Sequence, residues 1–226
     1  MLRVGVTTTS DGFPRWARAL SNAGFEPVAL PCIEIRPTDE LPRARSGAAK
    51  ADLLLITSAR TVAFLWPDGG MPPTPVAAVG PATAQAVTNA GGLVSITGRG
   101  DSDALIDGLA GHLTGRTILF PGAAGTDAGR AVRLTEMGAE VDVVPVYETL
   151  PIAPAGDPVD GTCFASPSAV RGWLLSRTFE ELGVVAAIGP VTAAELERHG
   201  VTPIEPTVPS LEALASALSA TLERSS

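Results

Sequence analysis

Several residue types are scarce in this 226-residue sequence. It has one tyrosine, two cysteines, two histidines and a single lysine, Lys50, beside fifteen arginines, and its formal net charge is −8. Nucleic-acid binding needs a dense basic patch, so this balance argues against a nucleic-acid partner. No apolar run reaches the roughly 18 residues of a membrane span, and the opening MLRVGVTTTS lacks a signal-peptide pattern. We therefore expect no nucleic-acid and no membrane partner.

The common catalytic and cofactor motifs are also missing. Cys32 and Cys163 lie in apolar, strand-like runs, and two buried thiols without a signal peptide indicate the cytoplasm rather than a disulfide framework. Cysteines and histidines show no metal-ligand spacing, and the chain lacks a phosphate-loop lysine motif, a GxGxxG after a strand and a GxSxG elbow. We therefore interpret Ser58, Ser166 and Ser168 as helix caps or ligand-binding hydroxyls rather than nucleophiles.

One stretch of the chain occurs twice, as VAAVGPATA from residue 76 and as VAAIGPVTA from residue 185. In each copy an apolar run of strand length ends at Gly-Pro, Gly80 and Gly189 suit the tight turn, and the proline suits the first helical position. Thr83 and Thr192 then fall in the first helical turn, beside backbone N–H groups that can receive an anion. The alternative is an ordinary strand-to-helix turn, but two copies favour a shared ligand site.

The rest of the chain alternates strands and helices and also repeats, at an offset of about 108 to 114 residues. Such alternation predicts parallel sheets covered on both faces, with function outside the carboxyl ends of the strands. Small polar residues gather at those ends, Thr8 and Gly122 among them. We expect strands at 2–9, 26–35, 51–57, 76–79, 93–97, 117–121, 140–147, 162–165 and 185–188, and helices at 14–23, 58–66, 81–90, 103–113, 127–137, 190–199 and 211–222.

The domain boundaries follow from where proline gathers. The segments 37–41 and 150–158 are the linker-like ones, and each comes after the first two strands of its repeat. This predicts an α/β protein of two similar domains with parallel sheets flanked by helices. One domain comprises 1–36 plus 159–226 and the other 42–149. A two-stranded hinge would join them, with a cleft between them, where ligand sites are common.

Tyr147 lies at the end of a predicted strand and the start of the hinge. Its phenol could donate a proton or a hydrogen bond, or the ring could simply pack against the linker. Four arginines lie at or near helix starts and could pair with carboxylates, although a solvated position is the simpler reading for each: Arg60, Arg99, Arg130 and Arg171.

The combined pattern resembles uroporphyrinogen-III synthase, the cyclising enzyme of tetrapyrrole biosynthesis. The resemblance covers nearly the whole chain and depends on the order and spacing of several stretches. They are ITSARTVAFL (56–65), AAVGPATAQAV (77–87), FPGAAGTDAGRAVRLTEMGAEVDVVPVYETLP (120–151), FASPSAV (164–170), AAIGPVTAAELERHGV (186–201) and PTVPSLEALASAL (206–218).

The resemblance implies two α/β domains joined by a two-stranded hinge and a reaction without metal or organic cofactor. Hydroxymethylbilane, a linear tetrapyrrole with eight carboxylates, would lose its hydroxyl as water and close with ring D inverted through a spiro intermediate. Tyr147 matches the family's hinge tyrosine and would be catalytic. The substrate-binding set would be Thr8, Ser58, Arg60, Gly80, Thr83, Gly122, Ser166, Ser168, Gly189 and Thr192. We expect a monomer in the cytoplasm, with substrate handed over from the preceding deaminase.

Two departures keep an alternative open. Many members read Thr-Arg-Pro after the first strand, whereas this chain reads Thr8-Thr9-Ser10, and the family's Ser-Pro-Arg appears as Ser58-Ala59-Arg60. The missing arginine weakens one anion contact and would suit a non-catalytic small-molecule sensor on the same fold, while Tyr147 and the two threonines favour the enzyme. A flavodoxin-like redox protein fits poorly, because no tyrosine or tryptophan lies in a phosphate-loop context.

Overall fold

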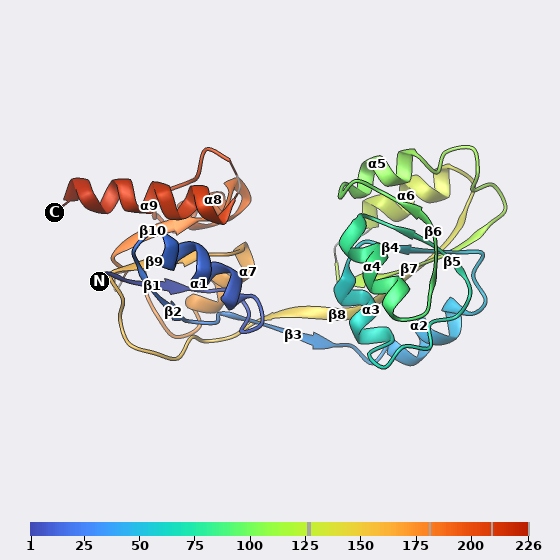
Figure 1. The fold of residues 1–226 in the computed structure, drawn as a ribbon, viewed down its shortest axis with the longest axis horizontal. Coiled ribbons are helices and arrows are strands. Elements are labelled where there is room, and N and C mark those ends of the chain that lie inside the picture. Colours follow the sequence, from blue (N-terminus) through green and yellow to red (C-terminus); the bar gives the residue numbers. More distant parts are fainter. Residues whose placement is uncertain (126–127, 181, 209, 226) are drawn as a thin grey trace. The chain divides into compact units, whose positions relative to one another are not determined.

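The computed structural model describes residues 1–125, 128–180, 182–208 and 210–225. Contacts between Cα atoms divide the chain into two units (Figure 1). Unit 1 combines Met1–Ile35 with Thr149–Ser226, and unit 2 is Arg36–Glu148.

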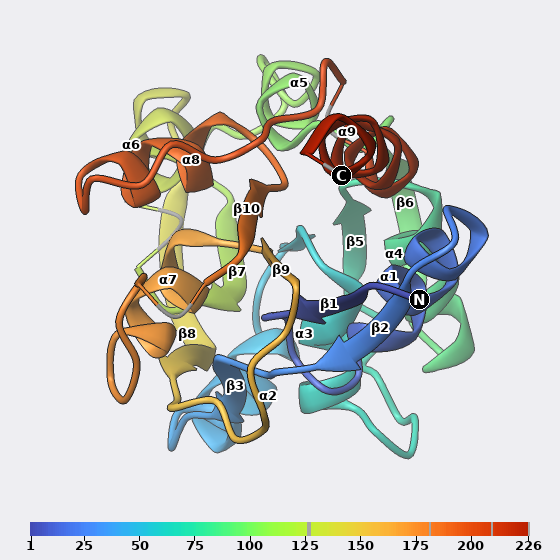
Figure 2. The ribbon, with the colours of Figure 1, turned by 90° about the vertical axis from the view of Figure 1, so that its left-hand side faces the viewer.

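Unit 1 contains a four-stranded parallel sheet. Its strands are β1 (Arg3–Val6), β2 (Glu26–Ala29), β9 (Gly161–Phe164) and β10 (Val184–Ala187), in the order β10-β9-β1-β2. The pairs β1–β2, β1–β9 and β9–β10 all run parallel, and Figure 2 shows β1 beside β2. This is the arrangement that alternating strands and helices predict.

Helices cover both faces of this sheet. Trp16 and Leu20 of α1 (Phe13–Asn22) pack with Leu214 and Leu218 of α9 (Leu211–Ser225) against one face. Helices α7 (Pro167–Trp173) and α8 (Pro190–Glu197) pack against the other. Successive residues of β9 point to opposite faces, as a strand requires, so Cys163 joins the first core and Phe164 the second.

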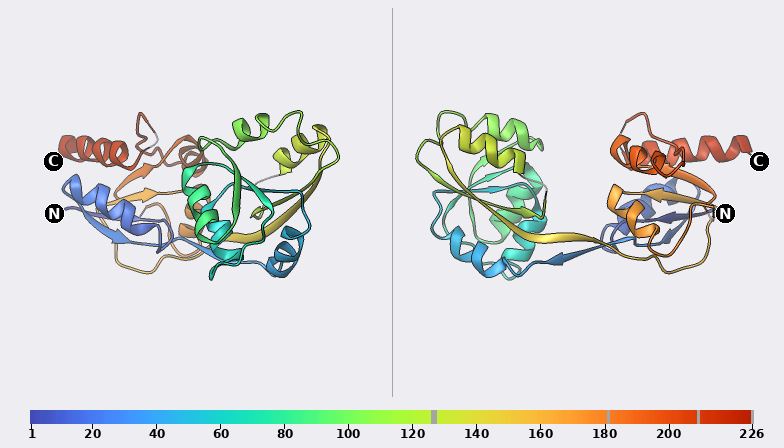
Figure 3. Two further views of the ribbon diagram at one scale, coloured as in Figure 1. Left: turned by 45° about the vertical axis from the view of Figure 1, so that its right-hand side comes forward. Right: turned by 180° about the vertical axis from the view of Figure 1, so that it is seen from behind.

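Unit 2 contains a six-stranded sheet in the order β3-β8-β7-β4-β5-β6. The strands are β3 (Ile33–Pro37), β4 (Leu53–Ile56), β5 (Pro75–Ala78), β6 (Leu93–Thr97), β7 (Thr117–Ala123) and β8 (Glu140–Pro151). The pairs β8–β7, β7–β4, β4–β5 and β5–β6 are parallel. Both unit boundaries fall inside the neighbouring strands β3 and β8 (Figure 3).

Strand β3 runs opposite to β8. Thr38 donates its backbone N–H to Val146 O at 3.2 Å, and Ile152 donates to Cys32 O at 2.9 Å. The partner number therefore falls as the residue number rises, which is the register of an antiparallel pair.

The helices of unit 2 also form two layers. Leu105 and Ile106 of α5 (Ser102–Asp107) and Leu134 of α6 (Ala128–Glu136) pack on Leu53 and Leu55 of β4. Leu54 and Ile56 point to the opposite face. There α2 (Leu41–Ala48), α3 (Ala59–Leu65) and α4 (Pro81–Asn89) pack side by side.

Several predicted element boundaries were wrong. The single strand expected at 26–35 is two strands, β2 and β3, in different sheets. Strand β8 continues through residues 148–151, and α2 begins at Leu41, a helix that the pattern did not predict. The helix expected at 103–113 ends at Asp107, because turns take over at Gly108 and at Gly111, whose φ is 80°.

No helix within the described ranges is both long and apolar enough to cross a membrane.

Candidate functional site at the carboxyl edges of the sheets

In unit 2 the strand order brings five of the predicted residues to one edge. Tyr147 of β8 lies opposite Ala123, the last residue of β7. Ser58 follows β4, and Gly80 follows β5. The four strands are neighbours in the order β8-β7-β4-β5. The carboxyl ends of β7, β4 and β5 form one continuous edge, and β8 passes this edge at Tyr147 before it continues to Pro151. Arg60 and Thr83 lie in the first turns of α3 and α4 at this edge.

The ring of Tyr147 is fixed and its hydroxyl is available. The side chain is 8% exposed and stacks on Phe64 of α3, with ring centroids 5.6 Å apart. In the described part of the chain the phenol oxygen has no hydrogen-bond partner. Protein atoms do not cover it completely, so solvent can reach it. The ring of Tyr147 is therefore packed against a neighbour, as one of the two alternatives predicted. This packing leaves the hydroxyl free to bind a ligand.

The two repeated turns have closely similar backbones. Gly80 (φ −170°, ψ 178°) and Gly189 (φ −178°, ψ 177°) are extended N-cap residues without a capping side chain, and a proline follows each. The first N–H groups of α4 and α8 therefore have no side-chain acceptor. A Cβ on Gly80 would lie 3.2 Å from Gly100, whereas a Cβ on Gly189 would meet nothing within 4 Å. Close packing thus explains the glycine in the first copy only.

Thr83 and Thr192 are buried side chains with unused hydroxyls. They are 5% and 3% exposed. Within the described ranges neither hydroxyl has a hydrogen-bond partner, and neither oxygen is sealed from solvent, in contrast to the enclosed, unpartnered hydroxyls of Thr61 and Thr162. Both hydroxyls are therefore free to donate a hydrogen bond to a ligand at the turn.

The carboxyl edge of unit 1 holds the other predicted residues. Thr8 is half-buried in the loop after β1, Ser166 and Ser168 begin α7 after β9, and Thr192 follows β10. Beside Thr8, the Thr7 hydroxyl donates to Cys163 O at 3.1 Å and accepts from Ala165 N at 3.2 Å. These bonds join the ends of β1 and β9 and fix the edge locally.

Two of the predicted serines cap helices. Ser58 accepts from Arg60 N at 3.1 Å at the start of α3, and Ser166 accepts from Ala169 N at 3.2 Å at the start of α7. Capping is one of the two roles predicted for these serines, and an N-cap of this kind contributes about 1 kcal/mol to stability.

Ser168 belongs to a charged network that the sequence did not reveal. It accepts from Arg171 Nη2 at 3.1 Å, and Arg171 Nη1 pairs with Glu195 of α8 at 3.2 Å. Glu195 also pairs with Arg198 at 2.5 Å. The network ties α7 to α8, the helix that follows the N-cap residue Gly189. The ion pair between Glu195 and Arg198 could be predicted from their helical spacing. The pair with Arg171 could not, because only the fold brings Arg171 close to Glu195.

Burial alone would raise the pKa of Glu195, but hydrogen bonds from Arg198 and Arg171 outweigh it, so the pKa is lowered. A lowered pKa means that the carboxylate stabilises the fold above its unfolded pKa, roughly 4.3, and that this contribution is lost as the pH falls. Glu195→Gln should lower the free energy of unfolding at pH 7 by about 1 kcal/mol, because both arginines are largely exposed.

Urea unfolding of Glu195→Gln and wild type at pH 7 and pH 3 tests this expectation. The difference between them should shrink at pH 3, while Glu197→Gln, an exposed position on the same helix, should match wild type at both. A difference of equal size at both pH values would contradict the ionic origin.

Gly122 is not in a binding loop. The sequence placed it at the start of a small-residue loop, but β7 extends to Ala123, and Gly122 is a buried strand residue opposite Pro145. The later part of that predicted loop, residues 126–127, lies outside the described residues.

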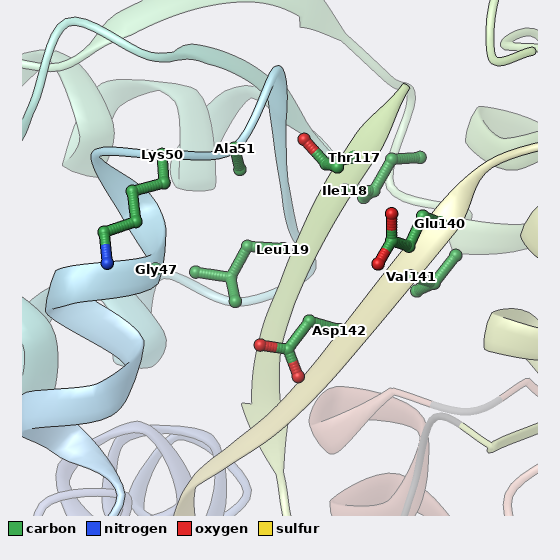
Figure 4. Close-up of a pocket in the computed structure, with 9 residues that line it drawn as sticks. All are labelled: Gly47, Lys50, Ala51, Thr117, Ile118, Leu119, Glu140, Val141 and Asp142. Atoms are coloured by element: carbon green, nitrogen blue, oxygen red, sulfur yellow. The ribbon is translucent and has the colours of Figure 1, made fainter. Parts of the chain in front are cut away.

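Two surface pockets of unit 2 lie away from these residues. A pocket of about 450 Å³ is lined by the amino ends of β7 and β8 and the end of α2 (Figure 4). Glu140 and Asp142 project from β8 beside Leu119, with Lys50 across from them. A second pocket, of about 420 Å³, lies around Trp66. None of the predicted site residues lines either pocket, so the candidate site depends on the carboxyl edges.

A metal centre finds no support in the described ranges, where no three His, Cys, Asp or Glu side chains come together as ligands. Burial raises the pKa of the Cys32 and Cys163 thiols to about 12, so both are protonated and poor nucleophiles.

Comparison with known proteins assigns this arrangement to a family. The family model described as Uroporphyrinogen-III synthase HemD matches residues 14–216. The chain belongs to this family. A curated protein of Methanothermobacter thermautotrophicus, named "Putative uroporphyrinogen-III synthase", is 28% identical over 248 aligned positions, which cover 97% of this chain and 98% of that protein.

Solved structures of the family share the fold. Uroporphyrinogen-III synthetase from Helicobacter pylori matches with a TM-score of 0.67 at 19% identity, covering 98% of this chain and 100% of the other. A mutant uroporphyrinogen III synthase from Thermus thermophilus matches with a TM-score of 0.60 at 20% identity, covering 99% and 98%. The resemblance seen in the sequence and the expected fold class are thereby confirmed.

Proposed function

We propose that this member of the uroporphyrinogen-III synthase family is the cyclising lyase that converts hydroxymethylbilane to uroporphyrinogen III and water. The observation that carries the proposal is the pair of matching turns. Each offers a helix N-terminus without a side-chain cap and a buried threonine whose hydroxyl has no hydrogen-bond partner in the described ranges and is open to solvent, at the carboxyl edge of a parallel sheet. Two such anion sites suit a substrate with many carboxylates.

The chemistry asks more for orientation than for strong acids or bases. In the family reaction the substrate's hydroxyl leaves as water, ring D attacks in the inverted sense through a spiro intermediate, and the ring closes. The substrate also cyclises unaided to the wrong isomer, so the enzyme must hold its ends. Good orientation can supply about 7–11 kcal/mol without a strong acid or base.

Substrate capture would use local groups. The protein has a formal net charge of −8 and the substrate eight carboxylates, so the overall field is repulsive. Helix N-termini at Gly80 and Gly189 can still bind carboxylates, at about 0.3–1 kcal/mol for each exposed charge. We assign Thr83 and Thr192 as direct ligands. Ser58, Ser166 and Ser168, with Thr8 and Arg60, would surround them within their own units.

Tyr147 is the best candidate to assist loss of the hydroxyl, because its phenol is unpartnered and its ring is held by Phe64. Tyr147→Phe keeps the stacking and removes the donor. We expect kcat to fall several-fold, since the substrate loses its hydroxyl readily, with little change in stability. Steady-state kinetics and urea unfolding measure both. Phe64→Leu is the matched control, expected to lower stability more than kcat, and an unchanged kcat in Tyr147→Phe would remove the phenol as donor.

Product analysis tests the function itself. Hydroxymethylbilane is supplied by a coupled deaminase, the purified protein is added, and the oxidised porphyrin isomers are separated. Isomer III should predominate. If only isomer I forms, at the spontaneous rate, the protein has the fold of the family without synthase activity. That result would favour a non-catalytic small-molecule sensor.

The proposal extends to the setting of the enzyme. We propose a monomer in the cytoplasm that receives its unstable substrate directly from the deaminase. The two cysteines, both free and buried, suit a reducing compartment. Light scattering of the purified protein tests the oligomeric state. The coupled assay tests the direct transfer of substrate, because substrate released into solution cyclises spontaneously to isomer I.

A further inference from the structure

The loop Gly98-Arg99-Gly100 after β6 is fixed against the end of β5. Gly98 donates its N–H to Ala78 O at 2.8 Å, and Gly100 donates to Val79 O at 2.8 Å. A Cβ on Gly98 would lie 2.6 Å from Val79 O, so only glycine permits this approach. The backbone of Arg99 is therefore held in place between two anchored residues.

The same loop packs against the first repeated turn. A Cβ on Gly80 would lie 3.2 Å from both N and Cα of Gly100, and α4 begins at the next residue, Pro81. Arg99 thus stands beside the N-terminus of a nine-residue helix. The second repeated turn has no such neighbour, because the space around Gly189 is open to 4 Å.

Arg99 carries a charge that its surroundings do not neutralise. It is exposed, and across the described ranges it makes no ion pair or hydrogen bond. The nearest acidic residues along the chain have other partners. Asp101 caps α5 through Asp103 N at 2.8 Å and Ala104 N at 3.3 Å, and Asp103 pairs with Arg133 at 2.7 Å.

Three kinds of anion donor therefore belong to the β5–α4 turn and to the loop that packs against it. They are the uncapped N–H groups of α4, the guanidinium of Arg99 and the hydroxyl of Thr83, which is unpartnered although its residue is only 5% exposed. A guanidinium can bind both oxygens of a carboxylate at once, which a hydroxyl cannot.

We propose that Arg99, with Thr83 and the N-terminus of α4, forms a clamp for one carboxylate of the substrate, which makes the β5–α4 turn the stronger of the two anion sites. The inference rests on the proposed function for the identity of the ligand. It adds a binding residue outside the repeated motif and makes the two copies of that motif unequal.

The experiment compares Arg99→Gln with Arg18→Gln in the full-length protein. Arg18 is an exposed arginine past the first turn of α1, so both variants lose the same charge from the surface. The first measurement is the Kd of uroporphyrin III, the oxidised octacarboxylate product, by tryptophan fluorescence at low and high salt. The second is KM and kcat for hydroxymethylbilane. Circular dichroism confirms that each variant is folded.

We expect Arg99→Gln to raise both Kd and KM about fivefold with kcat unchanged, and Arg18→Gln to change neither by more than about twofold. Arg99→Lys should be intermediate, because it keeps the charge and loses the fork. Equal effects of Arg99→Gln and Arg18→Gln, or no binding of uroporphyrin III by wild type, would overturn the clamp. If wild type forms only isomer I, the proposed function fails, and the Kd comparison alone decides the clamp.

Discussion

Gly172→Ala should destabilise unit 1 by about 3 kcal/mol or more. A Cβ on Gly172 of α7 would lie 1.9 Å from Cys32 O and 2.8 Å from Ile152 O. Both are backbone atoms, and Ile152 N donates to Cys32 O at 2.9 Å, so neither can move aside like a flexible side chain. Relief requires α7 to shift away from the core that Trp173 fills.

The matched control is Gly129→Ala in α6. Gly129 is exposed, its added Cβ would meet nothing within 4 Å, and its φ is not positive. Alanine there should stabilise the protein by about 0.5–1 kcal/mol, because glycine costs backbone entropy in a helix. Urea unfolding followed by circular dichroism measures both variants. A Gly172→Ala protein as stable as wild type would show that α7 can move without cost.

The same substitution links packing to the site. Ser166 and Ser168 begin α7, and Arg171 pairs with Glu195 from its last turn. A shift of α7 would therefore also disturb the carboxyl edge of unit 1. Any Gly172→Ala protein that folds should show a raised KM as well as lower stability.

The repeated turns were predictable because their chemistry is local. An apolar run, a glycine and a proline at N1 specify a strand end and a helix start with no distant partner. The structure places β5 and β10 before these turns and α4 and α8 after them, with Pro81 and Pro190 as first helical residues. The parallel sheets follow from the alternation of elements in the same way.

The strands around Pro31 and Pro145 show where local patterns fail. The two prolines occupy matching places in the repeat, in VALPCIE and DVVPVYE. The first separates β2 from β3, which enter different sheets, whereas β8 continues through the second to residue 151. Nothing in either segment distinguishes these outcomes, since pairing with distant strands decides them.

The sequence predicted which residue types form the candidate site, but not which of these residues contact one another. Strand order brings Tyr147, Ser58 and Gly80 to one edge, as the rule for parallel sheets leads one to expect. The stacking of Phe64 on Tyr147 and the pairing of Arg171 with Glu195 join residues far apart in sequence. Whether the hydroxyl of a buried threonine is open to solvent, as in Thr83, or sealed from it, as in Thr61, depends on tertiary packing that no spacing reveals.

The double variant Thr83→Val/Thr192→Val should raise KM by about a hundredfold with a much smaller change in kcat. Valine keeps the volume of each buried side chain and removes only the hydroxyl. A hydrogen bond to a charged group contributes about 1.5–3 kcal/mol, so each loss should weaken binding about tenfold or more, and two separate sites should add. Because neither hydroxyl has a partner in the described part of the chain, the variant should be as stable as wild type.

Thr61→Val is the control that separates ligand binding from the removal of any buried hydroxyl. Thr61 is fully buried in α3, and its hydroxyl is also unpartnered, but that oxygen is sealed from solvent. No ligand can reach it, so valine should leave KM unchanged and should be neutral or stabilising, because an unsatisfied polar group is lost. The single variants at Thr83 and Thr192 then rank the two turns, and the Arg99 clamp predicts the larger rise in KM at Thr83. A normal KM in the double variant would mean that the repeated turns serve only the fold.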